Sequence, residues 1–212
     1  MGKAERIGLP MSILDDLCVC EQRAKILVEI GQGGETPSTR DGKEMHRQLN
    51  RIARLLKKSL ESRHYNALEG PYIEGLEVSY PIRVGNLEFL MVGVPDIVTF
   101  VSSRDTFFVL EVEVATYSTA VKTVFLRQAL YALSLYERYG FCTIPVLLVI
   151  PSLGEAKTYI LFRGRDWENR IRHAIERLAK IVGGEVEPKP PRNPDICSSC
   201  PPRIRGLCPL WG

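Results

Sequence analysis

The pattern of apolar and polar positions divides the chain into helical and extended segments. Apolar residues that recur every three to four positions predict helices, and short runs that alternate or are continuously apolar predict strands. The run from Thr143 to Ile150 is continuously apolar, as in a strand buried on both faces. Helices are predicted over residues 10–30, 40–63, 119–139 and 166–182, and strands over residues 76–84, 87–100, 106–115, 143–150 and 157–162.

The order of these elements indicates a mixed α/β fold. Helices come first, three strands with short turns follow, and a long helix then leads to a further strand. The turns at Gly85-Asn86 and Ser102–Asp105 are short enough to join the three strands in an antiparallel meander. We therefore expect a mixed central sheet with a meander, flanked by helices. Residues 183–194 hold four prolines and two glycines and are predicted to be a linker, which divides a core (1–182) from a C-terminal segment (183–212).

The first predicted helix carries a capping pattern and two cysteines. Ser12 is a candidate N-cap, with Asp15 three residues later as the acid of a capping box. Cys18 and Cys20 are expected to lie in the middle of this helix or at a break in it.

Composition indicates a soluble globular protein. The 212 residues suffice for one domain, or for one domain and a small appendage, and 45% are hydrophobic and 25% charged. The formal net charge of +3 fits a nucleic-acid partner only weakly. No apolar run is long enough to span a membrane, and the first residues lack the apolar core of a signal peptide. We expect a cytoplasmic protein, whose six cysteines serve as ligands or core residues rather than in disulfides.

Four cysteines form a candidate metal site. Cys197, Cys200 and Cys208 give the spacing C-x2-C-x7-C near the C-terminus, and Cys20 is the expected fourth ligand, with Cys18 its competitor. Because the ligands come from both ends of the chain, such a site would act as a clasp. Four thiolates suit zinc or an iron–sulfur cluster equally well by number.

A second candidate site is made of carboxylates. Asp96 follows Pro95, which fixes the backbone at a strand start or bulge, and Glu111 and Glu113 share one face of a predicted strand. The apolar residues between and around them are expected to face the core. Carboxylates on adjacent strands can hold Mg²⁺ or Mn²⁺, and His46 would add a nitrogen ligand if its helix packs against the sheet. The alternative is a solvated strand face beside an ordinary turn.

Taken together, these residues resemble a known family. Gly93-Val94-Pro95-Asp96, then Glu111, then Gln128 and Tyr131 on the next helix, resemble the PD-(D/E)-x-K nuclease superfamily in its RecB-like branch. With the upstream His46 and the four cysteines, residues 12–209 resemble the CRISPR-associated RecB-like exonucleases with an iron–sulfur cluster, the Cas-four family. The segment Cys20-Glu21-Gln22-Arg23-Ala24 is similar to the Cys-x-x-Arg-Ala segment of that family.

The resemblance implies a metal-dependent DNA exonuclease. It makes His46, Asp96 and Glu111 ligands of Mn²⁺ or Mg²⁺, with the carbonyl of Val112 as a further ligand. Gln128 and Tyr131 would position DNA or the nucleophile. The implied activity trims single-stranded DNA from its 5′ end, in preparing DNA for CRISPR spacer acquisition, and the implied partners are DNA and the CRISPR adaptation integrase.

For the cysteines, the resemblance favours an iron–sulfur cluster over zinc. It implies a 4Fe–4S cluster, while the sequence itself leaves a 2Fe–2S cluster open. Cys20 is favoured over Cys18 as the first ligand because Arg23 and Ala24 follow it, as in the family segment. Cys197, Cys200 and Cys208 would be the other ligands.

Two departures from the family pattern bear on activity. Glu113 stands where the family has a lysine that activates the attacking water, and Lys122 on the next helix is a candidate replacement. Gln128 and Tyr131 are one residue closer together than in the family. Two alternatives therefore stay open: a catalytically weak DNA-binding subunit of the CRISPR adaptation complex, and a zinc-binding interaction module.

Overall fold

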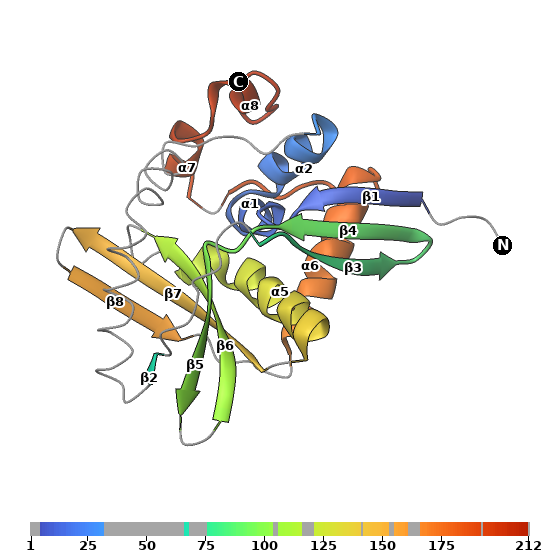
Figure 1. The fold of residues 1–212 in the computed structure, drawn as a ribbon. Coiled ribbons are helices and arrows are strands. Elements are labelled where there is room, and N and C mark those ends of the chain that lie inside the picture. The colour runs from blue at the N-terminus through green and yellow to red at the C-terminus, as the bar shows by residue number, and fades with distance from the viewer. Residues whose placement is uncertain are drawn as a thin grey trace.

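The computed structural model describes residues 5–31, 66–67, 76–103, 106–115, 121–140, 142–152, 155–160, 166–191 and 193–211. The helix predicted over residues 40–63, which carries His46, lies outside these ranges. Within them the chain is mixed α/β, with strands in two sheets and helices packed on them (Figure 1). The mixed α/β class predicted from the sequence is confirmed.

The first predicted helix is two helices joined at Cys20. Helix α1 (Ile13–Val19) and helix α2 (Glu21–Glu29) meet at this residue, whose φ of −159° and ψ of 112° are those of extended backbone. Of the two expectations for Cys20, the break is therefore the one observed. The predicted capping box is wrong. Ser12 occupies the N-cap of α1 but makes no side-chain capping bond, and Asp15 pairs with Arg127 instead.

Among the described residues the strands form two sheets, of three and of five strands. The first has the order β1-β4-β3, with β1 parallel and β3 antiparallel to β4. The second has the order β2-β5-β6-β7-β8, in which only β6 and β7 are parallel among the described strands. The strands are β1 (Glu5–Pro10), β2 (Asn66–Ala67), β3 (Val78–Val84), β4 (Leu87–Gly93), β5 (Ile97–Ser103), β6 (Thr106–Ala115), β7 (Thr143–Ser152) and β8 (Glu155–Ile160).

The predicted strand 87–100 and the three-strand meander are corrected by this arrangement. The chain leaves β4 after Gly93 and enters β5 at Ile97, and these two strands belong to different sheets. Pro95 lies in the intervening segment, and proline has no N–H to donate to a strand ladder. The segment Val94–Asp96 is thus a crossing between sheets rather than the middle of a strand.

Helix α5 (Val121–Tyr139) connects the two sheets. It contacts β3 of the first sheet and β6 and β7 of the second, and it also packs on α1 and α6 (Trp167–Val182) (Figure 1). Leu130 and Leu135 of α5 are fully buried in the main core. No helix within the described ranges is both long and apolar enough to cross a lipid bilayer.

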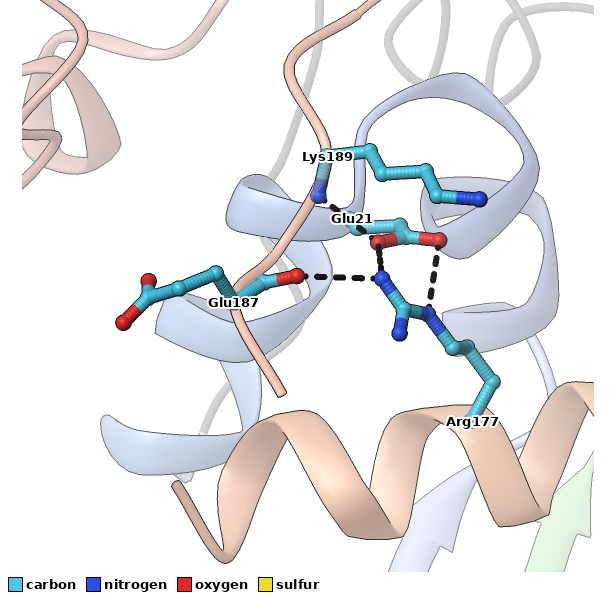
Figure 2. Close-up of polar contacts among 4 residues, drawn as sticks. All are labelled: Glu21, Arg177, Glu187 and Lys189. Atoms are coloured by element: carbon cyan, nitrogen blue, oxygen red, sulfur yellow. Dashed lines mark hydrogen bonds and ion pairs between the residues drawn. The ribbon is translucent and has the colours of Figure 1, made fainter. Parts of the chain in front are cut away.

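The C-terminal segment packs beside α2, near the start of the chain. Short helices α7 (Asp195–Ser198) and α8 (Pro202–Arg205) follow α6, and α8 contacts α2 (Figure 1). Figure 2 shows how Glu21 fastens this junction. Its carboxylate accepts hydrogen bonds from Nε and Nη2 of Arg177 at 3.1 and 2.8 Å and from the backbone N–H of Lys189 at 2.7 Å. Nη2 of Arg177 also donates to the carbonyl of Glu187 at 3.0 Å.

Replacing Glu21 by glutamine is expected to destabilise the protein at neutral pH and to have a smaller effect in acid. Burial raises the pKa of Glu21, but the hydrogen bonds from Arg177 and Lys189 outweigh this effect and hold the pKa below its ordinary value of 4.5. The ionised form is therefore favoured in the folded protein, so its contribution is complete above about pH 4.5 and is lost as the pH falls through the folded pKa. Denaturant unfolding of the parent and of Glu21→Gln at pH 7 and pH 3 measures this.

The control for that comparison is Glu29→Gln, on the same helix. Glu29 is half-exposed and lies 3.9 Å from Lys25, so its replacement should change the free energy of unfolding little at either pH. Equal losses for the two variants at pH 7 would contradict the assignment of the junction to Glu21.

Candidate functional site

Glu111 lies in the middle of β6 and is fully buried. Its neighbours Leu110 and Val112 are buried too, so both faces of β6 are covered here. The prediction that the apolar residues of this strand face the core is confirmed for Leu110 and Val112. The alternative of a solvated strand face is wrong for Glu111, because α5 covers the face that carries it. A carboxylate in such a place is costly unless donors or a cation compensate it, and this marks Glu111 as a candidate functional group.

Gln128 of α5 is the hydrogen-bond partner of Glu111. It is fully buried, and its Nε2 donates to Oε2 of Glu111 at 3.2 Å and to the carbonyl of Val146 in β7 at 2.8 Å. Both partners are acceptors, so the amide nitrogen must face them and the amide oxygen must point away. Among the described residues, none donates to that oxygen. Gln128 therefore orients the carboxylate and presents a buried acceptor beside it.

Tyr131, one turn further along α5, contacts the segment that leads to Asp96. Its hydroxyl donates to the carbonyl of Val94 at 3.3 Å, and the side chain is 3% exposed. A Cβ on Gly93 would lie 2.7 Å from Cε1 and 2.8 Å from the hydroxyl of Tyr131, closer than real contacts allow. Glycine is thus required where the tyrosine packs on the crossing between the sheets.

Asp96 is half-buried and immediately precedes β5. Ile97 pairs with Val112 and Val98 with Glu111, so Asp96 lies at the end of the ladder beside the carboxylate-bearing part of β6. Four of the residues predicted from the sequence, Asp96, Glu111, Gln128 and Tyr131, thus lie along neighbouring parts of β5, β6 and α5.

The other predicted residues of the carboxylate site are described in part or not at all. Glu113 lies in β6, paired with Leu147, and Lys122 lies in the first turn of α5, but their side chains are outside the described part of the structure. His46 falls outside the described ranges. In those ranges no three His, Cys, Asp or Glu side chains are grouped to hold a metal ion.

The carboxylate residues nevertheless supply the type of ligand atom, oxygen, that a divalent cation requires. Mg²⁺ and Mn²⁺ prefer oxygen ligands and retain several waters, so two carboxylates can suffice on the protein side. The buried amide oxygen of Gln128, which accepts from none of the described residues, suits a water bound to such an ion.

The second site is a small cavity walled by cysteines. Cys20, Cys197, Cys200 and Cys208 all line a cavity of about 20 Å³, together with Arg23 and with residues of the C-terminal segment. Cys18 is exposed and is not among the residues that line it. The extended backbone at Cys20 thus marks the place where α2 meets the three C-terminal cysteines.

The number and type of these donors fit zinc or an iron–sulfur cluster. In the described part of the structure the sulfur atoms are not gathered into a ligating group. Burial raises the pKa of the Cys20 and Cys200 thiols, although Arg23 acts to lower that of Cys200. Metal binding would have to displace these protons, so we expect its affinity to rise with pH.

Two ion pairs beside the sites were not predicted. Arg23 Nη2 lies 2.7 Å from Oδ1 of Asp16, and Arg127 Nε lies 2.8 Å from Oδ2 of Asp15. The sequence did contain a signal, since two adjacent acids in an otherwise apolar helix require basic partners when they are buried. Residue spacing does not predict which basic residues pair with these two acids.

Comparison with known proteins identifies the fold. No protein-family model matches the chain, and no curated protein is similar to it. Solved structures share its fold. The crystal structure of SSO0001 superposes with a TM-score of 0.56 at 18% identity, over 98% of this chain and 89% of the other. A "putative exonuclease" from Eubacterium rectale superposes with a TM-score of 0.53 at 11% identity, over 96% of this chain and 93% of the other. At these identities the likeness concerns the fold alone.

Proposed function

We propose that this protein is a metal-dependent deoxyribonuclease whose reaction centre includes Asp96 and Glu111. The observation that carries the proposal is the fully buried Glu111, which is oriented by Gln128 and pairs in the strand ladder with Val98, two residues after Asp96. An apolar core does not retain a carboxylate at such a position for stability. The fold is shared with a protein described as a "putative exonuclease", which supports a nuclease function.

The residues of this chain have separate parts in the proposed reaction. Asp96, Glu111 and the Val112 carbonyl would hold Mn²⁺ or Mg²⁺, with His46 as a nitrogen ligand. A cation held there supplies charge stabilisation to a phosphodiester and lowers the pKa of bound water. Gln128 orients the Glu111 carboxylate, and Tyr131 holds the segment before Asp96 through the Val94 carbonyl. Glu113 and Lys122 are candidates for activating the attacking water.

The finer parts of the proposal rest on the sequence resemblance. The fold would be of the restriction-endonuclease-like, RecB-like class, and the enzyme would act on single-stranded DNA in the 5′-to-3′ direction. It would serve CRISPR spacer acquisition beside the adaptation integrase. The four cysteines would hold an iron–sulfur cluster. Two observations agree with a cofactor at the thiols, namely the common cavity and the position of Cys20 between two helices. The division at residue 183 remains a prediction.

Digestion of 5′-end-labelled and 3′-end-labelled single-stranded DNA with Mn²⁺ tests the proposed activity. We expect the parent to degrade the DNA and Asp96→Ala to be slower by at least about a thousandfold, since the cation contributes several kcal/mol to the transition state. Glu185→Gln removes an exposed carboxylate and should match the parent. Equal rates for Asp96→Ala and the parent would exclude the proposed centre.

A DNA-binding protein without nuclease activity is the second candidate. It is favoured by Glu113, which replaces the family lysine with a carboxylate. Under this alternative the parent binds labelled single-stranded DNA in Mn²⁺ but leaves it intact, and Glu113→Lys introduces cleavage.

A further inference from the structure

Two consecutive carboxylates on α1 reach two different parts of the molecule. Successive residues in an α-helix are about 100° apart around its axis, so the side chains of Asp15 and Asp16 diverge. Asp15 meets Arg127 of α5 at 2.8 Å, and Asp16 meets Arg23 of α2 at 2.7 Å. All four side chains are 20% exposed or less.

Each arginine belongs to the surroundings of one candidate site. Arg127 immediately precedes Gln128, whose amide bonds to Glu111. Arg23 lines the cavity walled by the cysteines. Both ion pairs therefore begin on the same turn of α1, but one leads to the carboxylate site and the other to the thiols.

We infer that Asp15 and Asp16 form a shared anchor, in which Asp15 positions α5 and thereby Gln128 against Glu111, while Asp16 positions Arg23 at the thiol cavity. The link of these two roles to catalysis and to cofactor binding rests on the proposed function. The four residues are positioning residues, because each acts through a neighbour rather than on a substrate.

Charge and burial support a positional role for these pairs. An ion pair this short and this poorly hydrated holds its partners in a narrow range of geometry, whereas an exposed pair does not. Loss of one partner leaves a mostly buried charge, so the helix that bears it must shift or take in water. Because Arg127 and Gln128 share one turn of α5, a shift at Arg127 moves the amide of Gln128 as well.

Arg127→Met and Arg23→Met are matched variants for testing the anchor. Each keeps a long apolar stem and removes one guanidinium from one aspartate, and each is the control for the other. Burial raises the pKa of Asp15 to about 7, against the opposing effect of Arg127, so the experiment is run at pH 8 to keep the pair ionised.

The first measurement is hydrogen exchange of the full-length protein. Arg127→Met should speed exchange of amides in residues 124–133 about tenfold and leave residues 195–208 at the parental rate, because the ion pair that holds this part of α5 is lost. Arg23→Met should do the reverse, and Arg127→Lys should recover most of the protection. Equal acceleration of both segments by both variants, or none, would overturn the anchor.

The second measurement is metal binding. We expect Arg127→Met to weaken Mn²⁺ binding about tenfold and to leave zinc binding unchanged, and Arg23→Met to do the opposite. Loss of both metals in both variants would overturn the division of roles. Failure of the parent to bind Mn²⁺ would instead count against the proposed function, and the exchange measurement would still decide the anchor. If Arg127→Met does not fold, Asp15→Asn breaks the same pair from the other side.

Discussion

Replacing Glu111 by glutamine is expected to abolish metal-dependent cleavage while making the protein more stable. Glutamine has nearly the same shape but no charge, so it should remain in the buried position beside Gln128. Removing a buried charge should raise the free energy of unfolding by about 1 kcal/mol. Loss of a ligand should slow cleavage about a thousandfold or more. Denaturant unfolding and the DNA digestion assay, carried out on the same preparations, measure the two effects.

The opposite signs of these effects separate a functional carboxylate from a structural one. If Glu111 only supported the fold, its glutamine variant would be less stable, and any loss of activity would follow from unfolding. A variant that is both stabilised and active would contradict the assignment of Glu111 to the reaction centre. Glu185→Gln is the control for a general effect of removing negative charge.

Replacing Gly93 by alanine is expected to be costly for both stability and activity. The added methyl group would meet the ring of Tyr131 at 2.7 Å, and the ring is held in the core by its surroundings. Overpacking of this kind costs about 1–3 kcal/mol. The strain falls on the three residues before Asp96, so we also expect weaker Mn²⁺ binding, measured by titration alongside denaturant unfolding.

A second substitution tests the physical cause of that loss. In the double variant Gly93→Ala with Tyr131→Ala, the ring that obstructs the methyl group is absent. The losses of stability in the single variants Gly93→Ala and Tyr131→Ala should then sum to more than the loss in the double variant. Additive losses would show that Gly93 is required for some reason other than contact with Tyr131. Tyr131→Phe keeps the ring, so it should not relieve the effect of Gly93→Ala.

The sequence predicted the regular elements where the hydrophobic pattern is long and uninterrupted. The strand predicted over 106–115 has the observed bounds of β6, and α5 (Val121–Tyr139) lies within the helix predicted over 119–139 and shares its last residue. The strand predicted over 87–100 failed because its pattern continues through Val94 and Pro95, where the chain changes sheets. Strand β1 was missed because six residues that include Gly8 and Pro10 carry a weak strand signal, and its parallel pairing with β4 is a tertiary contact.

The candidate site was predicted by residue type more fully than by geometry. Asp96, Glu111, Gln128 and Tyr131 were singled out, yet the sequence did not indicate that Tyr131 packs on Gly93 or that Gln128 bonds to Glu111. Such contacts depend on how α5 lies across β6, and no local spacing encodes that. The same holds for Asp15, whose position suggested a helix cap while its partner lies more than a hundred residues away.

The junction at Glu21 has a consequence for how the chain is completed during synthesis. Its donors come from residues 156 and 168 positions later, so the junction closes a loop of most of the chain. Contacts of such long range form late, because the entropy of loop closure is lost before they contribute. A nascent chain emerges at about 5–20 residues per second, so α2 waits roughly ten seconds or more after its own synthesis for Arg177 and Lys189. During that interval Cys20 has been made without Cys197, Cys200 and Cys208, so any cofactor that the four share is acquired only after Cys208 has been synthesised.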